Sequence, residues 1–169
     1  MSFDPRSASP DPNYHRYVSH HANHALMLSA AIKEARASFA NSGIPIGAVL
    51  VNSAGTIVGR GHNLRVQTGD PIAHGEMSCL RNAGRRRDYQ SLTMYTTLAP
   101  CIMCTGALLL YKIPRVVVGE SRTFPGELDL LRANGVEVNV LDAVECIELM
   151  REFIGTHPDV WNEDIGIPS

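Results

Sequence analysis

Two stretches decide the fold of this chain: AHGEMSCLRNA (73–83) and LTMYTTLAPCIMCTGALLLYKIPRVVVGE (92–120). The first is compatible with a helix that stops at Gly84, and the second begins with a β-rich strand. After Pro100 comes an apolar segment of helical length, which Pro114 ends before a short buried strand. The centre of the chain is therefore expected to alternate helix, strand, helix and strand.

The segments on either side extend this alternation. Before the central stretches we expect an amphipathic helix at residues 20–40 and two strands, 46–51 and 56–61, joined by a hairpin turn. After them we expect a helical piece at 127–135, a fifth strand at 136–141 and a long helix at 143–155. A tail follows at residues 157–169. Because helices and strands alternate, the sequence predicts an α/β fold: a three-layer αβα sandwich with a central mixed five-stranded sheet flanked by helices.

The length of the chain corresponds to one domain. With 169 residues it can bury a core of its own without disulfide bonds. Three of the ten prolines lie within the first twelve residues, and each disfavours helix at the residue before it. We therefore expect a flexible N-terminal arm at residues 1–17 and a single domain at residues 18–169.

Charge and cysteine content narrow the function classes. Lys and Arg total 15 against 17 for Asp and Glu, a net charge of -2, so no basic field is available to bind nucleic acid. The most apolar windows are too short to cross a membrane, and the N-terminus lacks the pattern of an export signal. Four cysteines are too few for a secreted disulfide scaffold. We expect a cytoplasmic protein, with the nucleus as a second compartment, that binds neither nucleic acid nor membranes.

Two short motifs, HGE and PCIMC, carry the chemistry, and each lies at the start of an expected helix. Cys101 and Cys104 project from one helical face, close enough for both thiolates to bind one ion. With His74 they provide three protein ligands, the arrangement of a catalytic zinc ion whose fourth position is open to water. Zinc lowers the pKa of bound water to about 7, and Glu76 is placed to exchange protons with that water. We expect one Zn²⁺ per subunit.

Each motif alone has another explanation. A lone CxxC also occurs in redox-active pairs, and a lone HxE occurs often by chance. Together and in this order they form the known signature of the zinc-dependent deaminases of nucleobases, so we expect a hydrolase that acts on C–N bonds. A non-catalytic, zinc-stabilised binding module, in which Glu76 would be idle, is the alternative from another class. Cys79 and Cys146 stand alone and are expected to be buried, inert thiols.

A longer set of matching runs covers about residues 22 to 166: GIPIGAVLVN, GRGHN, HGE, YTTLAPCIMCTGALLLY, IPRVVVGE and WNEDIG. In these runs the chain resembles the yeast-type cytosine deaminases of the cytidine and deoxycytidylate deaminase superfamily. The resemblance implies a cytidine deaminase-like fold and a zinc-dependent homodimer. It also implies conversion of free cytosine to uracil and ammonia in pyrimidine salvage.

The resemblance also assigns residues that contact the base. They are Ile46, Asn63, Gly75, Phe124, Trp161 and Asp164. Asn63 would bond the O2/N1 edge with help from the Gly75 N–H group, Phe124 and Trp161 would close over the ring, and Asp164 would lie near the amino group. From the residues alone, Asn63 could instead stabilise its own turn, Trp161 could anchor the tail, and Phe124 could fill the core.

In the implied reaction, a zinc-bound hydroxide attacks C4 of cytosine while Glu76 protonates N3, and Glu76 then delivers a proton to the departing ammonia. Two related activities compete with this hypothesis. One is deamination of another small amino-heterocycle, such as guanine, a pterin or isocytosine, and the other is deamination of adenosine in tRNA. The tRNA enzymes need a basic rim around the site, which the net charge of -2 disfavours. The run Arg85–Arg87 is expected to be a solvated loop.

Overall fold

The structure is a computed structural model that describes residues 14–167, with side chains from residue 23 onward. Its elements follow in the order α1 Tyr14–Ala40, β1 Gly47–Val51, β2 Ile57–His62, α2 Arg65–Thr68, α3 Gly75–Ala83, the 3-10 turn η1 Tyr89–Ser91, β3 Thr93–Leu98, α4 Ile102–Leu110, β4 Arg115–Glu120, α5 Leu128–Ala133, β5 Glu137–Val140, α6 Val144–Thr156 and α7 Pro158–Asp164. Residues 1–13 of the expected arm lie outside the described part. Helix α1 includes residues 14–17, so it begins earlier than the apolar pattern at 20–40 indicates.

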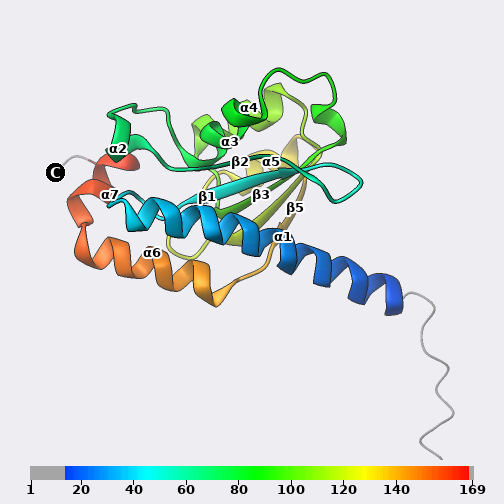
Figure 1. Cartoon of the computed structure of the whole chain (residues 1–169), viewed down its shortest axis with the longest axis horizontal. Helices are drawn as coiled ribbons and strands as arrows, with labels where there is room; N and C mark the ends of the chain where they lie inside the picture. Colours follow the sequence, from blue (N-terminus) through cyan, green and yellow to red (C-terminus); the bar gives the residue numbers. More distant parts are fainter. Residues whose placement is uncertain (1–13, 168–169) are drawn as a thin grey trace, which may run out of the picture.

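A five-stranded sheet in the order β2-β1-β3-β4-β5 forms the centre of the molecule (Figure 1). β1 is antiparallel to both β2 and β3, whereas β3, β4 and β5 run parallel to one another. The β1–β2 hairpin closes as expected, because Gly55 donates its N–H to the Asn52 carbonyl at 2.9 Å and adopts a φ of 78°, which favours glycine. The sheet is therefore mixed, as the sequence predicts.

Helices cover both faces of this sheet. α1 and α6 lie on one face, and α3, α4 and α5 lie on the other (Figure 1). The strands alternate accordingly: Val49 and Val117 belong to the apolar cluster beneath α1 and α6, and Leu50 and Val116 belong to the cluster beneath α3 to α5. The three-layer αβα sandwich is confirmed. Within the described residues, no helix combines the length and the apolar character needed to cross a bilayer.

The segment expected to be a tail is in part helical. Pro158 occupies the first turn of α7, where its missing N–H removes no helical hydrogen bond. α7 packs beside α2, another short helix that the sequence analysis did not predict, and Arg65 on α2 forms an ion pair with Glu163 at 3.1 Å (Figure 1). Trp161 on α7 joins a third apolar cluster at the end of the sheet. α7 therefore closes the end of the sheet at which α3 and α4 begin.

Candidate active site

The site is built at the N-termini of α3 and α4. His74 is the N-cap of α3 and Cys101 is the N-cap of α4, each with extended backbone (φ -67°, ψ 165° and φ -70°, ψ 174°). Cys104 is the third residue of α4 and lies one turn from Cys101, and the two thiols form a hydrogen bond. Local helix-start geometry therefore brings the two thiols together, and the packing of α3 against α4 adds the imidazole.

The three predicted ligands form one group. The Nδ1 atom of His74 lies 3.5 Å from Sγ of Cys101, and the ligand atoms of His74, Cys101 and Cys104 all lie within 4.8 Å of one another. One imidazole nitrogen and two sulfurs are a donor set that zinc prefers, and three protein ligands leave the fourth tetrahedral position to another molecule. The donor set fits Zn²⁺, and the structure brings together the three residues that the two motifs predict as its ligands.

The three ligands differ in their ionisation. A hydrogen bond from Cys104 lowers the pKa of Cys101 to about 4. The same hydrogen bond, together with burial, raises the pKa of Cys104 well above its ordinary value. Burial lowers the pKa of His74, but the hydrogen bond to Cys101 and the nearby Asp164 carboxylate outweigh it, so the pKa is raised. At neutral pH one thiol is therefore already a thiolate, which is the form that binds metal.

Glu76 lies in the first turn of α3, buried beside the ligands. Its Oε1 atom accepts a hydrogen bond from the Thr96 hydroxyl on β3 at 2.7 Å. Burial raises the pKa of Glu76, the Cys101 thiolate adds to this effect, and the hydrogen bond from Thr96 opposes it. A carboxyl group whose pKa is raised above its ordinary value holds a proton more readily, which suits a group that both accepts and donates one.

Asp164, at the end of α7, lies on the other side of His74. Its Oδ1 atom is 3.5 Å from Nε2 of His74, 3.5 Å from Nδ2 of Asn63 and 3.7 Å from Nε of Arg65. Because Nδ1 of the imidazole faces the thiols, a carboxylate at Nε2 can hold the ring in its metal-binding orientation. Burial raises the pKa of Asp164, and the charges of His74 and Arg65 oppose this.

A narrow cavity of about 20 Å³ lies beside these groups. Its lining consists of Ile46, His74, Glu76, Leu98, Ala99, Cys101, Phe124, Trp161, Asp164 and Ile165. The rings of Phe124 and Trp161 meet edge to face with 5.9 Å between their centroids, and we call this pair the aromatic wall. Apolar walls with a few polar groups at one end are typical of a site for a small flat molecule.

Asn63 and Gly75 lie next to the cavity but are not among its lining residues. The Oδ1 atom of Asn63 accepts the N–H of Arg65 at 3.0 Å, so the turn role considered from the sequence is present, while its Nδ2 faces Asp164. Gly75 packs closely against Ile46, because a Cβ at this position would lie 3.0 Å from the Ile46 carbonyl oxygen.

Two further residues at the site were missed by sequence reasoning. Thr96 follows Met94 by two positions in β3 and therefore shares its buried face, so a hydroxyl at a core-facing position was the available signal. Arg65 carried no such signal, because its partner Glu163 lies 98 residues later in the chain. Only the packing of α7 against α2 brings the two together.

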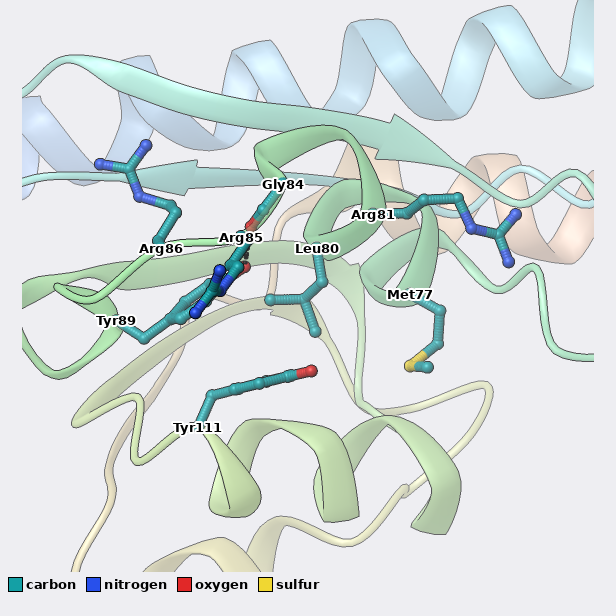
Figure 2. A pocket seen from close by; sticks show the side chains of 8 residues that line it. All are labelled: Met77, Leu80, Arg81, Gly84, Arg85, Arg86, Tyr89 and Tyr111. Atoms are coloured by element: carbon teal, nitrogen blue, oxygen red, sulfur yellow. Dashed lines mark hydrogen bonds between the residues drawn. The ribbon is translucent and has the colours of Figure 1, made fainter.

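A second hollow lies between α3 and α4, which we call the α3–α4 hollow (Figure 2). It is lined by Met77, Leu80, Arg81, Gly84, Arg85, Arg86, Tyr89 and Tyr111. Figure 2 shows the Tyr111 ring facing Leu80, and this ring stacks on Tyr89 with 4.8 Å between centroids. Arg86 is bound to Asp88 at 2.8 Å. The hollow shares no lining residue with the cavity at the metal ligands and belongs to the outer surface.

A family comparison covers the whole metal site. The profile of the family described as "Cytidine and deoxycytidylate deaminase zinc-binding region" matches residues 21–120, more than half of the chain. This range contains His74, Glu76, Cys101 and Cys104. The three metal ligands and the carboxyl group beside them are therefore inside the matched region.

Individual relatives carry two different names. A Candida albicans protein named cytosine deaminase is 52% identical over 141 residues, which cover 82% of this chain and 94% of that protein. A Streptococcus pyogenes serotype M1 protein named tRNA-specific adenosine deaminase is 37% identical over 139 residues, covering 75% of this chain and 80% of that protein. A solved structure from a study of A-to-I editing by tRNA:A34 deaminases superimposes with a TM-score of 0.62 at 26% identity, over 74% of this chain and 99% of that one.

Proposed function

The chain belongs to the cytidine and deoxycytidylate deaminase zinc-binding family, and from that premise we propose that it hydrolyses free cytosine to uracil and ammonia. The observation that carries the choice of base is the 52% identity, over 94% of its length, to the relative named cytosine deaminase. The cavity supports this choice, because its aromatic wall and its few polar groups suit a small flat base.

Zinc, when bound by His74, Cys101 and Cys104, supplies a water of lowered pKa at the open coordination position. Glu76 moves both protons of the water that adds to C4: its carboxylate accepts the first at Oε1 or Oε2 and passes it to N3 of the ring. It then accepts the second from the new C4 hydroxyl group and delivers it to the amino group, so that the C4–N bond breaks, the C4 carbonyl forms and ammonia leaves. The Thr96 hydroxyl serves both protonation states of Glu76. It donates to the carboxylate, and it can accept from the carboxylic acid while its own proton turns to the Leu98 carbonyl 3.1 Å away.

The base lies between Ile46 and the aromatic wall, with its amino group toward the carboxylates. Asp164 accepts a hydrogen bond from the exocyclic amino group. Asn63 offers its Nδ2 group to the O2/N1 edge, because its Oδ1 is held by the N–H of Arg65, and the Gly75 N–H assists at the same edge. Asp164 lines the cavity, and Asn63 lies next to it with its Nδ2 atom 3.5 Å from Oδ1 of Asp164.

A free base is favoured over a tRNA adenosine as substrate. Among the described residues that line the cavity, none is Lys or Arg, and the net charge of the chain is -2. Binding of tRNA depends on basic groups that neutralise phosphates around the site. The relatives named for tRNA also stand at lower identity, 37–44% against 52%.

Ammonia release by the zinc-loaded protein tests the proposal, with cytosine, guanine, isocytosine, a pterin and an adenosine-containing tRNA transcript as separate substrates. We expect release from cytosine only, with the Glu76→Ala variant as the zinc-retaining inactive control. Preferred release from another heterocycle or from the tRNA would overturn the choice of cytosine. Silence on every substrate would instead support a zinc-stabilised binding module.

We propose in addition that the protein is a homodimer whose second copy covers the outer face of α4. Helix α4 contains no charged residue, and Ile102 and Leu110 on it are 62% and 74% exposed. Exposed apolar patches of this kind mark interfaces. Tyr111, the residue after Leu110, lines the α3–α4 hollow, so the hollow adjoins this face of α4.

Sedimentation tests the assembly. We expect twice the monomer mass of 18.4 kDa for the native protein and the monomer mass for Leu110→Asp. The matched control is Val144→Asp, at a residue 66% exposed on α6 across the sheet, which should stay dimeric. A native mass near 18.4 kDa would contradict the dimer.

The same resemblance leads us to propose a role in pyrimidine salvage in the cytoplasm, with the nucleus as a second compartment. Growth on cytosine as the only pyrimidine source, by cells that lack their own deaminase, tests the first point. Imaging of the fluorescently tagged protein tests the second, and exclusive location in another compartment would contradict it.

A further inference from the structure

A carboxylate that the proposed reaction does not use is buried beside the cavity. Glu120, the last residue of β4, is 0% exposed. In the part of the chain whose side chains are described, no basic side chain forms an ion pair with it, and the nearby Arg122 guanidinium binds Asp142 at 3.0 Å instead. Burial of a carboxylate is unfavourable unless hydrogen bonds compensate. The hydrogen-bond partners of Glu120 therefore indicate which segment of the chain it stabilises.

The partners of this carboxylate belong to residues 121–127, which we call the strap. Oε2 of Glu120 accepts the N–H of Arg122 at 2.6 Å and the N–H of Thr123 at 3.0 Å, and Oε1 accepts the Thr123 hydroxyl. Two consecutive residues of the strap thus supply three donors. If the strap moved away, the buried carboxylate would lose these partners, which is strongly unfavourable.

The backbone that carries Glu120 is itself held in place. Its carbonyl accepts the N–H of Ala99 at 3.0 Å, and the carbonyl of Gly119 accepts the N–H of Ala143 at 2.8 Å. Gly119 packs so closely against α6 that a Cβ there would lie 2.6 Å from Sγ of Cys146. The carboxylate is therefore presented from a rigid position in the sheet.

The far end of the strap is tied to the segment that leads into the metal ligand Cys101. Glu127 donates its N–H to the carbonyl of Pro100 at 2.9 Å. Gly126 passes over the same segment with a φ of 57°, where a Cβ would meet the Pro100 oxygen at 2.6 Å. Phe124 lies between the two tied ends and lines the cavity as one half of the aromatic wall.

We infer that Glu120 is a positioning residue that holds the strap so that Phe124 stands against Trp161 before the base enters. Glu120 lines no part of the cavity and acts only through Phe124. Because the wall is ordered in advance, less conformational entropy is lost when the base binds. Glu120 therefore governs binding of the base more than the chemical step. The inference rests on the proposed function only for the identity of the base.

Three variants separate the hydrogen bonds of Glu120 from its charge and from general damage. Glu120→Ala removes all three acceptor contacts. Glu120→Gln keeps them, because its amide oxygen can accept both N–H groups while its NH₂ donates to the Thr123 hydroxyl. Arg122→Ala is the matched control in the same strap, since it loses only an exposed ion pair to Asp142. If Glu120→Ala does not fold, Thr123→Val removes the hydroxyl contact alone.

The first measurement is acrylamide quenching of Trp161, the single tryptophan of the chain, in zinc-loaded protein without substrate. We expect the quenching constant of Glu120→Ala to rise about twofold or more because the wall opens, with a smaller rise for Thr123→Val. Glu120→Gln and Arg122→Ala should match the native protein. The bound zinc should be equal in all variants, which excludes damage to the metal site.

The second measurement is steady-state kinetics with cytosine. For Glu120→Ala we expect KM to rise about tenfold while kcat changes less than about threefold, and Glu120→Gln should restore KM. Native quenching and KM in both Glu120→Ala and Thr123→Val would overturn the inference, as would a Glu120→Gln variant as impaired as the alanine variant. If the native protein does not act on cytosine, the proposed function fails, but the quenching of Trp161 still decides the role of Glu120.

Discussion

Replacing Thr96 by valine removes a hydroxyl that donates a hydrogen bond to Glu76 and leaves the shape of the side chain almost unchanged. The bond is 2.7 Å long, and both residues are buried. Valine cannot donate, so the Glu76 carboxylate would keep its burial and lose this neighbour. Thr96→Val therefore tests whether the orientation and ionisation of Glu76 depend on β3.

The size of the effect follows from the type of bond. A hydrogen bond to a charged group contributes about 1.5–3 kcal/mol, and if that amount is lost from the transition state, kcat/KM falls about 10- to 150-fold. Thr96→Ser keeps the hydroxyl and should recover most of the activity. Thr97→Val is the control, because Thr97 is an equally buried neighbour whose hydroxyl accepts the N–H of Gly47 and does not contact Glu76.

The pH dependence should change in one direction. Burial raises the pKa of Glu76, and the hydrogen bond from Thr96 opposes that rise, so its loss raises the pKa further. Glu76 must be ionised to accept a proton, and activity is lost as the pH falls through its pKa. The acidic limb of the kcat/KM profile should therefore move to higher pH in Thr96→Val and stay in place in Thr97→Val.

The assay is ammonia release at about pH 4 to 9, with zinc content measured on each sample. An unchanged rate and an unchanged acidic limb in zinc-loaded Thr96→Val would refute the reasoning. Equal losses in Thr96→Val and Thr97→Val would also refute it, because the effect would then come from a buried hydroxyl in general.

Three further predictions concern the metal site. Glu76→Ala should keep its zinc and lose about 10²- to 10⁴-fold in kcat, and near-normal turnover would contradict its role as proton carrier. Cys101→Ser should lose zinc by elemental analysis, so full occupancy in this variant would contradict the ligand assignment. In metal-free protein, iodoacetamide below neutral pH should label Cys101, whose pKa the hydrogen bond from Cys104 lowers to about 4, before Cys146, whose pKa burial raises to about 12. Peptide mass spectrometry reads the order, added zinc should protect Cys101, and earlier labelling of Cys146 would contradict the prediction.

Most of the fold could be predicted from the sequence because the signals for its helices and strands are local. The two motifs mark the starts of α3 and α4, and the N-cap and third-residue positions of α4 bring Cys101 and Cys104 together without help from the rest of the chain. The strands show apolar stretches bounded by turn residues. The helix α7 was missed because it has seven residues and no apolar repeat, although Pro158 was a signal for its start.

The sequence by itself determined the metal: the types and spacing of His74, Cys101 and Cys104 fit zinc, and Glu76 stands two positions from a ligand. Only the tertiary structure decided what surrounds that metal. Thr96 meets Glu76 because β3 lies under α3, and Asp164 meets His74 because α7 folds back across the end of the sheet. Spacing along a helix is set by the backbone, so it is encoded locally. Contacts between distant segments depend on how whole helices and strands pack to bury their apolar faces, and no short motif contains that information.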